Sequence, residues 1–268
     1  MLAATFILVL LPVLFFGAFL FGAWREGRHS PYSFGIGRVI SNSFSAIGAA
    51  PAVFLIGSVV LNMPLSLLPP LFPGNTIVQW IGAGGVGLAW LLFWPFIQLF
   101  LTAIALDGLA GRPADLHAAL TMAGRRFLPG LVLIVLMSIG LLAGFLMLVI
   151  PGIVLMLTWF VVLPVLANEG RGVFECFARS GELLNGMRWR LLLLLVIVAV
   201  LWSLFTGLAA GLAHSVAAQD GSWTKAAIDL VTSALAGMLQ TTGTAAVYHE
   251  ARTAKEGMGS HDLEAVFA

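Results

Sequence analysis

The feature that most constrains this chain is an apolar run over residues 127–167 that contains no charged residue. One crossing of a bilayer takes about 20 apolar residues. A run about twice that length must fold back on itself, and Pro151-Gly152 is its only break. The sequence therefore predicts two membrane spans here, joined by a minimal, uncharged external turn at Pro151-Gly152.

The composition of the whole chain agrees with a membrane protein. Of its 268 residues, 60% are hydrophobic and only 9% are charged, whereas a soluble domain carries about 25% charged residues. So few charges cannot cover a surface that faces water. The net charge of +1 gives no basic face for nucleic acid. The single cysteine, Cys176, cannot form an internal disulfide, which excludes a disulfide scaffold.

The first apolar run covers residues 2–24, and its positive charges, Arg25 and Arg28, follow it. A cleaved signal peptide has positive charges before its apolar run. The pattern therefore favours an uncleaved helix with its N-terminus outside. A cleaved signal and a true start downstream of this helix are the alternatives.

Four more apolar runs predict spans over residues 51–68, 77–106, 189–212 and 225–248, which gives seven spans in all. We expect Pro95 to kink the long third span. An external loop is expected at residues 214–223 and a mobile cytoplasmic tail at residues 253–268. The predicted fold is an all-α, polytopic transmembrane helical bundle.

Three segments combine apolar residues at helical spacing with polar residues on the other side. They lie at residues 33–46, 108–126 and 173–184, and each is predicted to be an amphipathic helix on the membrane surface. Ser33 is a candidate N-cap of the first helix. In the third, Glu175, Arg179 and Glu182 are interpreted as a solvated face.

The basic residues give the orientation. In this arrangement twelve of the thirteen lysines and arginines fall on one side of the membrane, and only Lys225 falls on the other. Basic residues concentrate on the cytoplasmic side of membrane proteins. The N-terminus is therefore predicted outside, and the C-terminus and the three amphipathic helices on the cytoplasmic side.

The same order of parts occurs three times, in units 33–108, 112–169 and 171–252 of a membrane domain that covers residues 32–252. Each unit reads as a surface helix, a span, a turn and a second span, and residues 1–31 precede them as an extra helix and linker. Each second span ends in an acid that is followed by a base. The three candidate boundary ion pairs are Asp107 with Arg112, Glu169 with Arg171, and Glu250 with Arg252. Two first spans carry a GxxxG pattern, at Gly140/Gly144 and Gly207/Gly211, which are candidate helix-packing positions.

The region from the Pro-Gly turn to the next span also carries a family resemblance. The positions concerned are Pro151, Gly152, Pro164, Ala178, Arg179, Ser180, Leu183, Gly186, Arg188 and Trp189. With them, residues 33–252 resemble the YciC-like proteins and the related membrane domain attached to some glycerophosphoryl diester phosphodiesterases. The resemblance implies a multi-pass protein of the bacterial inner membrane without an established activity. No phosphodiesterase catalytic domain is present, so that activity is not implied.

Few residues are candidates for chemistry. Gln98 and Gln240 are polar positions inside spans, explained by hydrogen bonds between helices or by a polar solute path. No His, Cys or acid spacing matches a metal site and no catalytic motif occurs, so neither a cofactor nor an enzymatic activity is expected. The bases of the surface helices are candidate contacts to anionic lipid headgroups: Arg38, Arg125, Arg126, Arg179, Arg188 and Arg190.

Two functional hypotheses follow. The first is a non-enzymatic inner-membrane protein that contacts lipid, organises the envelope or binds a partner. The second is a transporter or exporter of a small or lipid-like substrate, which requires Gln98, Gln240 and the boundary acids to meet in one cavity. An intramembrane enzyme comes third. A membrane-protein partner or a homo-oligomer is left open, and no nucleic acid is expected.

Overall fold

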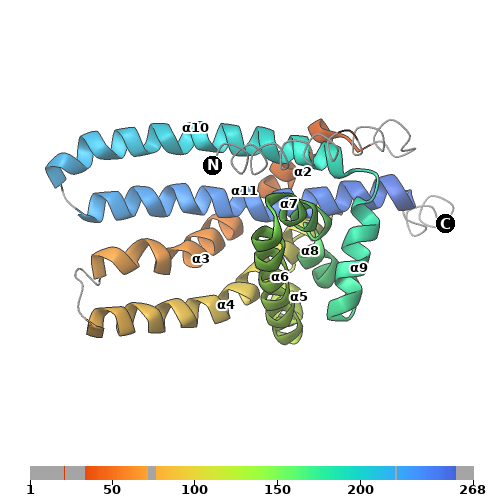
Figure 1. Ribbon diagram of the computed structural model, residues 1–268, viewed down its shortest axis with the longest axis horizontal. Helices are drawn as coiled ribbons and strands as arrows, with labels where there is room; N and C mark the ends of the chain where they lie inside the picture. Colours follow the sequence, from red (N-terminus) through yellow and green to blue (C-terminus); the bar gives the residue numbers. More distant parts are fainter. Residues whose placement is uncertain (1–20, 22–33, 72–76, 221, 258–268) are drawn as a thin grey trace, which may run out of the picture.

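The computed structural model describes residue 21 and residues 34–71, 77–220 and 222–257. Within these ranges the chain forms helices and the turns that connect them, with no strand. The protein is therefore all-helical, as the sequence predicts (Figure 1). The expected span at residues 2–24 and the N-cap Ser33 lie outside the described residues, apart from Phe21.

The helices follow the chain in a simple order. They are α2 (Ile36–Ala49), α3 (Pro51–Leu71), α4 (Ile77–Leu109), α5 (Leu116–Arg125), α6 (Phe127–Met147), α7 (Val149–Thr158), α8 (Val162–Glu169), α9 (Val173–Leu184), α10 (Arg188–Asp220) and α11 (Ser222–Glu256).

Four stretches of the described residues are long and apolar enough to cross a membrane. They are Ile81–Leu109 in α4, Phe127–Met147 in α6, Val149–Glu169 over α7 and α8, and Arg188–Gly211 in α10. Counting α2 and the first part of α3 as one broken crossing adds a fifth, although these two parts meet at 95°. The described residues thus give four or five candidate spans, and the count of seven stays a prediction. The long helix α11 is not among them, because its Gln and Thr residues lower its mean hydropathy.

The hairpin turn inside residues 127–167 is not where the sequence places it. The break falls at Leu148, which ends α6 and begins α7 with an extended backbone (φ −170°, ψ 148°). Pro151 and Gly152 lie inside the first turns of α7. Proline suits a first helical turn, because its missing N–H would have no partner there. The expected turn at Pro151-Gly152 is therefore wrong by about one helical turn.

The second half of this hairpin is itself broken, between α7 and α8 at residues 159–161. Pro164 explains the break, because its ring clashes with the carbonyl four residues earlier and it has no N–H to donate. The carbonyl of Thr158, freed at the end of α7, accepts a hydrogen bond from Ser180 Oγ at 2.7 Å. Helix α9 is thereby tied to the break.

Two other predicted boundaries also need correction. Helix α10 continues to Asp220, so most of the expected external loop at residues 214–223 is helical. The alanines in that stretch favour a helix strongly enough to extend it. Helix α11 likewise continues to Glu256, so the first residues of the expected tail are ordered as helix. Pro95 lies inside α4, which continues through it.

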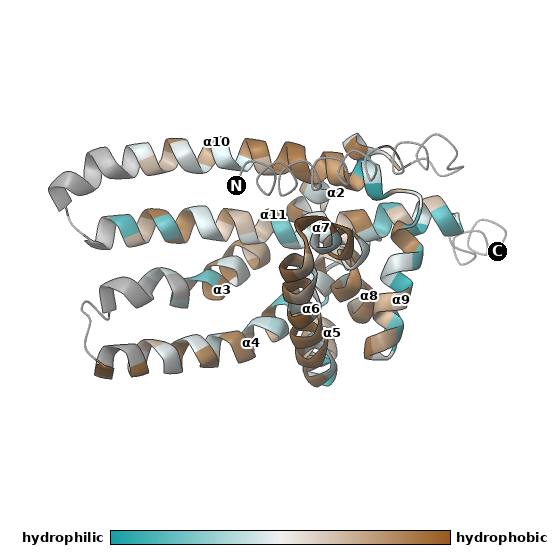
Figure 2. Cartoon of the chain, in the orientation of Figure 1, coloured by the Kyte–Doolittle hydropathy of each residue, from teal (hydrophilic) through white to brown (hydrophobic). Residues whose placement is uncertain are grey.

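The centre of the protein is formed by α4, α8 and α11, which contact one another. Leu99, Ile104, Val165 and Ala245 are fully buried there. Around this centre α3 packs on α4 and α11, α6 on α4 and α7, and α10 mainly on α11. Figure 2 shows α6 and α7 strongly hydrophobic, and hydrophilic residues on α9 and at the end of α11. The outward faces of α6 and α10 are apolar, with Leu142 62% and Leu208 72% exposed, as in helices that face lipid.

Candidate functional site

The acid at the end of α4 forms a local ion pair. Asp107 Oδ1 lies 2.8 Å from Arg112 Nη2 and 3.1 Å from Arg112 Nε. Arg112 leads into α5, where the N-cap Asp115 accepts a hydrogen bond from the Ala118 N–H at 2.9 Å. The Arg112 side chain is 63% exposed, and such surface pairs contribute about 0–1 kcal/mol. The pair therefore shapes the turn from α4 to α5 more than it stabilises the fold.

The acid at the end of α8 joins three helices. Glu169 accepts hydrogen bonds from Arg171 Nε at 2.6 Å and, from α9, Arg179 Nε at 3.2 Å. The Tyr248 hydroxyl of α11 donates to Glu169 Oε1 at 3.0 Å, and Asn168 Nδ2 donates to the Tyr248 oxygen at 2.9 Å. The Glu169 side chain is only 11% exposed. This carboxylate is thus a partly buried junction between α8, α9 and α11.

Arg179 extends this junction to the end of α11. Its guanidinium forms an ion pair with Glu256, which also accepts a hydrogen bond from Arg252 Nε at 2.8 Å. Burial alone would raise the pKa of Glu256, but the hydrogen bonds from Arg252 and Arg179 outweigh it and lower the pKa. The Arg179 side chain is 18% exposed. The interpretation of this side of α9 as a solvated face is therefore wrong for Arg179, because the end of α11 lies against it.

The acid near the end of α11 binds the start of α2. Glu250 Oε1 accepts hydrogen bonds from Arg38 Nε at 2.7 Å and from the Gly35 N–H at 3.0 Å. Gly35 is the N-cap of α2, so the carboxylate also lies at the positive end of the helix dipole. The expected pair of Glu250 with Arg252 is wrong. Arg252 pairs with Glu256 one helical turn further on, and Glu250 faces the other way, into the protein.

The three boundary acids share one relation that sequence spacing does not reveal. Asp107 at the end of α4 binds Arg112, which leads into α5, and Glu169 at the end of α8 binds Arg179 of α9. Glu250 of α11 binds Arg38 of α2. Glu169 and Glu250 thus each bind an arginine of the next short helix, Asp107 binds the arginine just before α5, and the three contacts together form a ring. A separation of 212 residues hides the Arg38–Glu250 pair from any local pattern.

The candidate headgroup contacts fall into two groups. Arg126 donates to the carbonyls of Leu166 and Ala167, both at 2.5 Å, and so caps the end of α8. Arg126 and Arg179 therefore both bind groups of the protein itself. Arg125, one residue earlier, is exposed at the end of α5.

The remaining three bases lie around the starts of α2 and α10. Arg190 donates to the Phe34 carbonyl at 3.1 Å. Arg188 is half-buried, and its buried Nε has no hydrogen-bond partner among the described residues. The side chain of Arg38 is 58% exposed despite its bond to Glu250.

The two intramembrane glutamines point to different places. Gln98 on α4 is 5% exposed and its Oε1 accepts a hydrogen bond from Thr241 Oγ1 of α11 at 3.0 Å. Gln240 is exposed and lies at the edge of a different, apolar groove. Within the described residues these glutamines and the boundary acids do not meet in one cavity. The hydrogen bond of Gln98 is instead the helix-to-helix contact expected of such a residue.

Of the four candidate packing glycines, the two in α6 lie close to a neighbouring helix and the two in α10 do not. A methyl group at Gly140 would lie 2.5 Å from the Trp159 ring, and one at Gly144 would lie 3.1 Å from the Gly152 Cα. Helices α6 and α7 therefore approach closely along this pair. At Gly207 and Gly211 an added methyl group would meet no described atom within 4 Å. The GxxxG of α10 thus makes no close contact with the described part of the chain.

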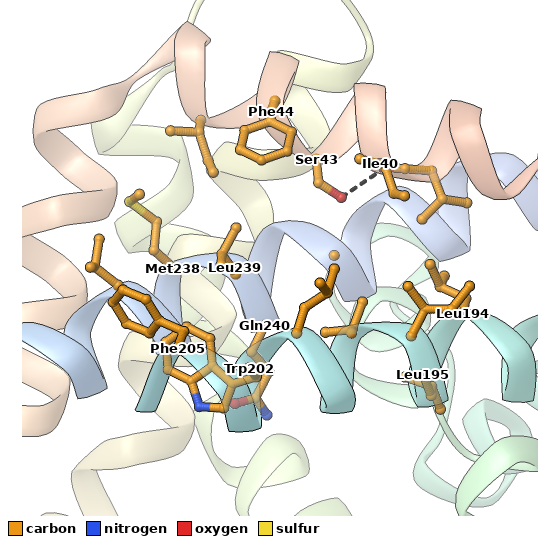
Figure 3. A pocket seen from close by; sticks show the side chains of 17 residues that line it. Ile40, Ser43, Phe44, Leu194, Leu195, Trp202, Phe205, Met238, Leu239 and Gln240 are labelled. Atoms are coloured by element: carbon orange, nitrogen blue, oxygen red, sulfur yellow. Dashed lines mark hydrogen bonds between the residues drawn. The ribbon is translucent and has the colours of Figure 1, made fainter. Parts of the chain in front are cut away.

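A groove with a volume of about 570 Å³ lies between α2, α10 and α11. Its walls are almost wholly apolar and include Phe44 of α2, Val198 of α10 and Met238 of α11. Figure 3 shows Trp202 and Phe205 near Met238 at one end, and Leu194 and Leu195 at the other. We call this hollow the α2–α10–α11 groove.

The lone cysteine, Cys176, is buried. Burial, with Glu169 and Glu175 nearby, raises the pKa of the Cys176 thiol to about 11. The thiol is therefore protonated at neutral pH, and it packs in the core. Among the residues that the structure describes, no three His, Cys, Asp or Glu side chains gather as metal ligands would.

Comparison with known proteins places the chain in a family. A family model described as "Domain of unknown function (DUF7847)" matches residues 116–251, just over half of the chain. No curated protein and no solved structure matches it. The matched part runs from the start of α5 into the last turns of α11, and it includes the Glu169 junction and Glu250. The protein belongs to the family of the domain of unknown function DUF7847.

Proposed function

We propose that the protein is a multi-pass integral membrane protein without enzymatic activity, whose surface helices contact anionic lipid headgroups. The observation that carries this proposal is the ring of acid–base contacts. Two of these contacts link α9 to the end of α8 and α2 to the end of α11, and the third, Asp107 with Arg112, shapes the turn from α4 into α5, so the surface helices lie at the ends of the central helices. Apolar faces on α6 and α10 then lie in the lipid tails, and exposed bases such as Arg125 lie at the headgroups.

The arrangement also supports the threefold repeat, and the distribution of basic residues supports the orientation. The units are α2–α3–α4, α5–α6–α7–α8 and α9–α10–α11, and in each case the next surface helix packs on the second span of the unit before it. With seven spans, the N-terminus lies outside and the surface helices lie in the cytoplasm. The resemblance to YciC-like proteins supports the bacterial inner membrane as the location.

The lipid contact is tested by measuring which lipids stay bound to the purified protein. Protein in detergent is mixed with equal amounts of phosphatidylglycerol and phosphatidylcholine, and bound lipid is counted by native mass spectrometry. We expect phosphatidylglycerol to be preferred. Arg125→Gln should lower that preference by about fivefold, since one base near the surface contributes about 1 kcal/mol. Lys225→Gln is the matched control. It removes an exposed base near the start of α11, on the side of the membrane opposite to that proposed for Arg125, and should leave the lipid preference unchanged. Equal binding of both lipids by the unaltered protein would overturn the proposal.

A further inference from the structure

A cluster of polar side chains lies where α3, α4 and α11 pack on one another (Figure 1). Gln98 is near the middle of the candidate span Ile81–Leu109, and its Oε1 accepts a hydrogen bond from Thr241 Oγ1 at 3.0 Å. The Thr241 hydroxyl shares its hydrogen with the Gly237 carbonyl, which lies 2.9 Å away and one turn earlier in α11. We call Ser58, Asn62, Gln98 and Thr241 the α3–α4–α11 polar cluster.

The two members of the cluster on α3 face the same turn of α11. A methyl group at Gly237 would lie 3.0 Å from Asn62 Nδ2 and 3.8 Å from Ser58 Oγ. Asn62 Nδ2 donates one of its two hydrogens to the Ser58 carbonyl at 2.8 Å. Since Thr241 contacts the Gly237 carbonyl and also Gln98, the four side chains gather around Gly237.

Ser58 is the member of the cluster whose bonding is incomplete. Its side chain is fully buried, and Oγ has no hydrogen-bond partner among the described residues. Other buried hydroxyls do have one: Thr242 of α11 donates to the Met238 carbonyl at 2.9 Å, within its own helix. Buried polar groups are nearly always paired, either with protein groups or with ordered water. Ser58 Oγ therefore needs a partner other than a protein group.

We propose that the α3–α4–α11 polar cluster binds a single water molecule, held by Ser58 Oγ and the side-chain amides of Asn62 and Gln98. A buried water typically makes two to four hydrogen bonds, and these three side chains can supply them. Asn62 is half-buried and Gln98 is 5% exposed, so space that a water molecule can reach adjoins both. The cluster contains no charged side chain, so a neutral ligand suits it better than an ion.

Contacts between α3 and α4 bound the site on both sides. On one side Leu101 packs so closely on α3 that a methyl group at Gly57 would lie 2.6 Å from its Cδ2. On the other side the indole N–H of Trp90 donates to the Leu61 carbonyl of α3. These contacts suit one held water better than a continuous polar path. The proposal rests on the packing of α3, α4 and α11 and not on the lipid preference proposed above.

The sign of one substitution distinguishes a held water from an unpaired hydroxyl. If Ser58 holds the water, Ser58→Ala removes a hydrogen bond, and the melting temperature in detergent should fall by about 2–4 °C. If the hydroxyl has no partner, the same substitution removes a buried unpaired group, and the melting temperature should rise. Ser43→Ala is the matched control, because the Ser43 hydroxyl is also buried but donates within its own helix, to the Val39 carbonyl at 2.8 Å. It should change the midpoint little.

A crystal structure grown in a lipid phase, at a resolution that shows ordered water, tests the site directly. We expect a density peak about 2.8 Å from Ser58 Oγ that also lies within hydrogen-bond distance of Asn62 or Gln98 and is lost in Ser58→Ala. No peak there in the unaltered protein would overturn the proposal, whatever the melting temperatures show. A midpoint that rises in Ser58→Ala would overturn it as well. So would an unchanged midpoint with the Ser58 hydroxyl turned to the Phe54 carbonyl of its own helix.

Discussion

At the scale of single residues, Glu169 and Glu250 link neighbouring helices through hydrogen bonds to their carboxylates. Glu250 is 5% exposed, yet its carboxylate receives both a guanidinium and a backbone N–H. Glu169 receives two guanidinium groups and a hydroxyl. A partly buried carboxylate that loses such donors is left unsatisfied, at a cost above that of a surface pair. These residues therefore matter more for the fold than the exposed pair of Asp107 and Arg112.

The contact between Glu250 and α2 gives the first prediction. Glu250→Gln removes the charge that Arg38 and the start of α2 face, and the melting temperature should fall by roughly 3–6 °C, the loss of one charge-assisted hydrogen bond in a chain of this size. Thermal unfolding in detergent, followed by tryptophan fluorescence, measures the change. Glu182→Gln is the matched control, because the Glu182 side chain is 69% exposed and should change the midpoint little. An equal effect of both substitutions would contradict the role of Glu250.

The lowered pKa of Glu256 gives a prediction about pH. The hydrogen bonds from Arg252 and Arg179 favour its charged form in the folded protein. Their stabilising effect is therefore present above the ordinary value of 4.5 and is lost as the pH falls through the lower folded pKa. The melting temperature of the unaltered protein should exceed that of Glu256→Gln at neutral pH, and the difference should shrink below about pH 4.5. A difference that stayed constant or grew toward acid pH would contradict this assignment.

Residue-scale contacts were only partly predictable from the sequence. The pairs Asp107–Arg112 and Glu169–Arg171 join residues five and two positions apart, so local spacing shows them. The partner of Glu250 lies 212 positions away, and nothing in local spacing distinguishes Arg252 from Arg38. The same holds for Arg179, whose second partner, Glu256, lies 77 positions away in a stretch expected to be a tail.

At the scale of helices, proline marks only one of the two breaks in the apolar run over residues 127–167. Periodicity and composition were enough to show that residues 127–167 form two limbs, because no single span is that long. They could not place the break, since Pro151 is compatible with a turn and with a first helical turn alike. The second break, at residues 159–161, follows from Pro164 and is stabilised by Ser180 of α9. That contact depends on tertiary structure and has no local sequence signal.

The close approach of α6 and α7 gives a prediction at this scale. Gly144→Ala places a methyl group 2.9 Å from Leu155 Cδ1 and 3.1 Å from the Gly152 Cα, and the backbone atom cannot move aside as a side chain can. Overpacking of this kind costs about 1–3 kcal/mol. Thermal unfolding should show the loss as a lower midpoint.

Gly211→Ala is the matched control for this prediction. It lies in the equivalent GxxxG of α10, where no described atom is within 4 Å of the added methyl group. Alanine also has the higher helix propensity. The midpoint of this variant should therefore be unchanged or slightly raised. Equal destabilisation at positions 144 and 211 would contradict the structure, because it would mean that the GxxxG patterns of α6 and α10 are packed equally closely.

At the scale of the whole molecule, the structure confirms the all-helical fold that the sequence predicted. The threefold order of surface helix and hairpin stays a prediction. The sequence predicted seven spans, whereas length and composition single out four or five in the described residues. The difference arises partly because α11, at the centre, has protein rather than lipid on several sides and so tolerates Gln and Thr. Hydropathy alone does not separate such a helix from a buried helix of a soluble protein.

The central claim is that α2, α5 and α9 share one face of the membrane, the cytoplasmic face. Single cysteines at Gly37, Thr121 and Ala178, each exposed on one of these helices, are placed in a Cys176→Ala background. They are then treated with a membrane-impermeant maleimide in intact cells and in inverted membrane vesicles. The account predicts that all three react in inverted vesicles and none in intact cells. Reaction of even one of the three from the outside of intact cells would contradict it.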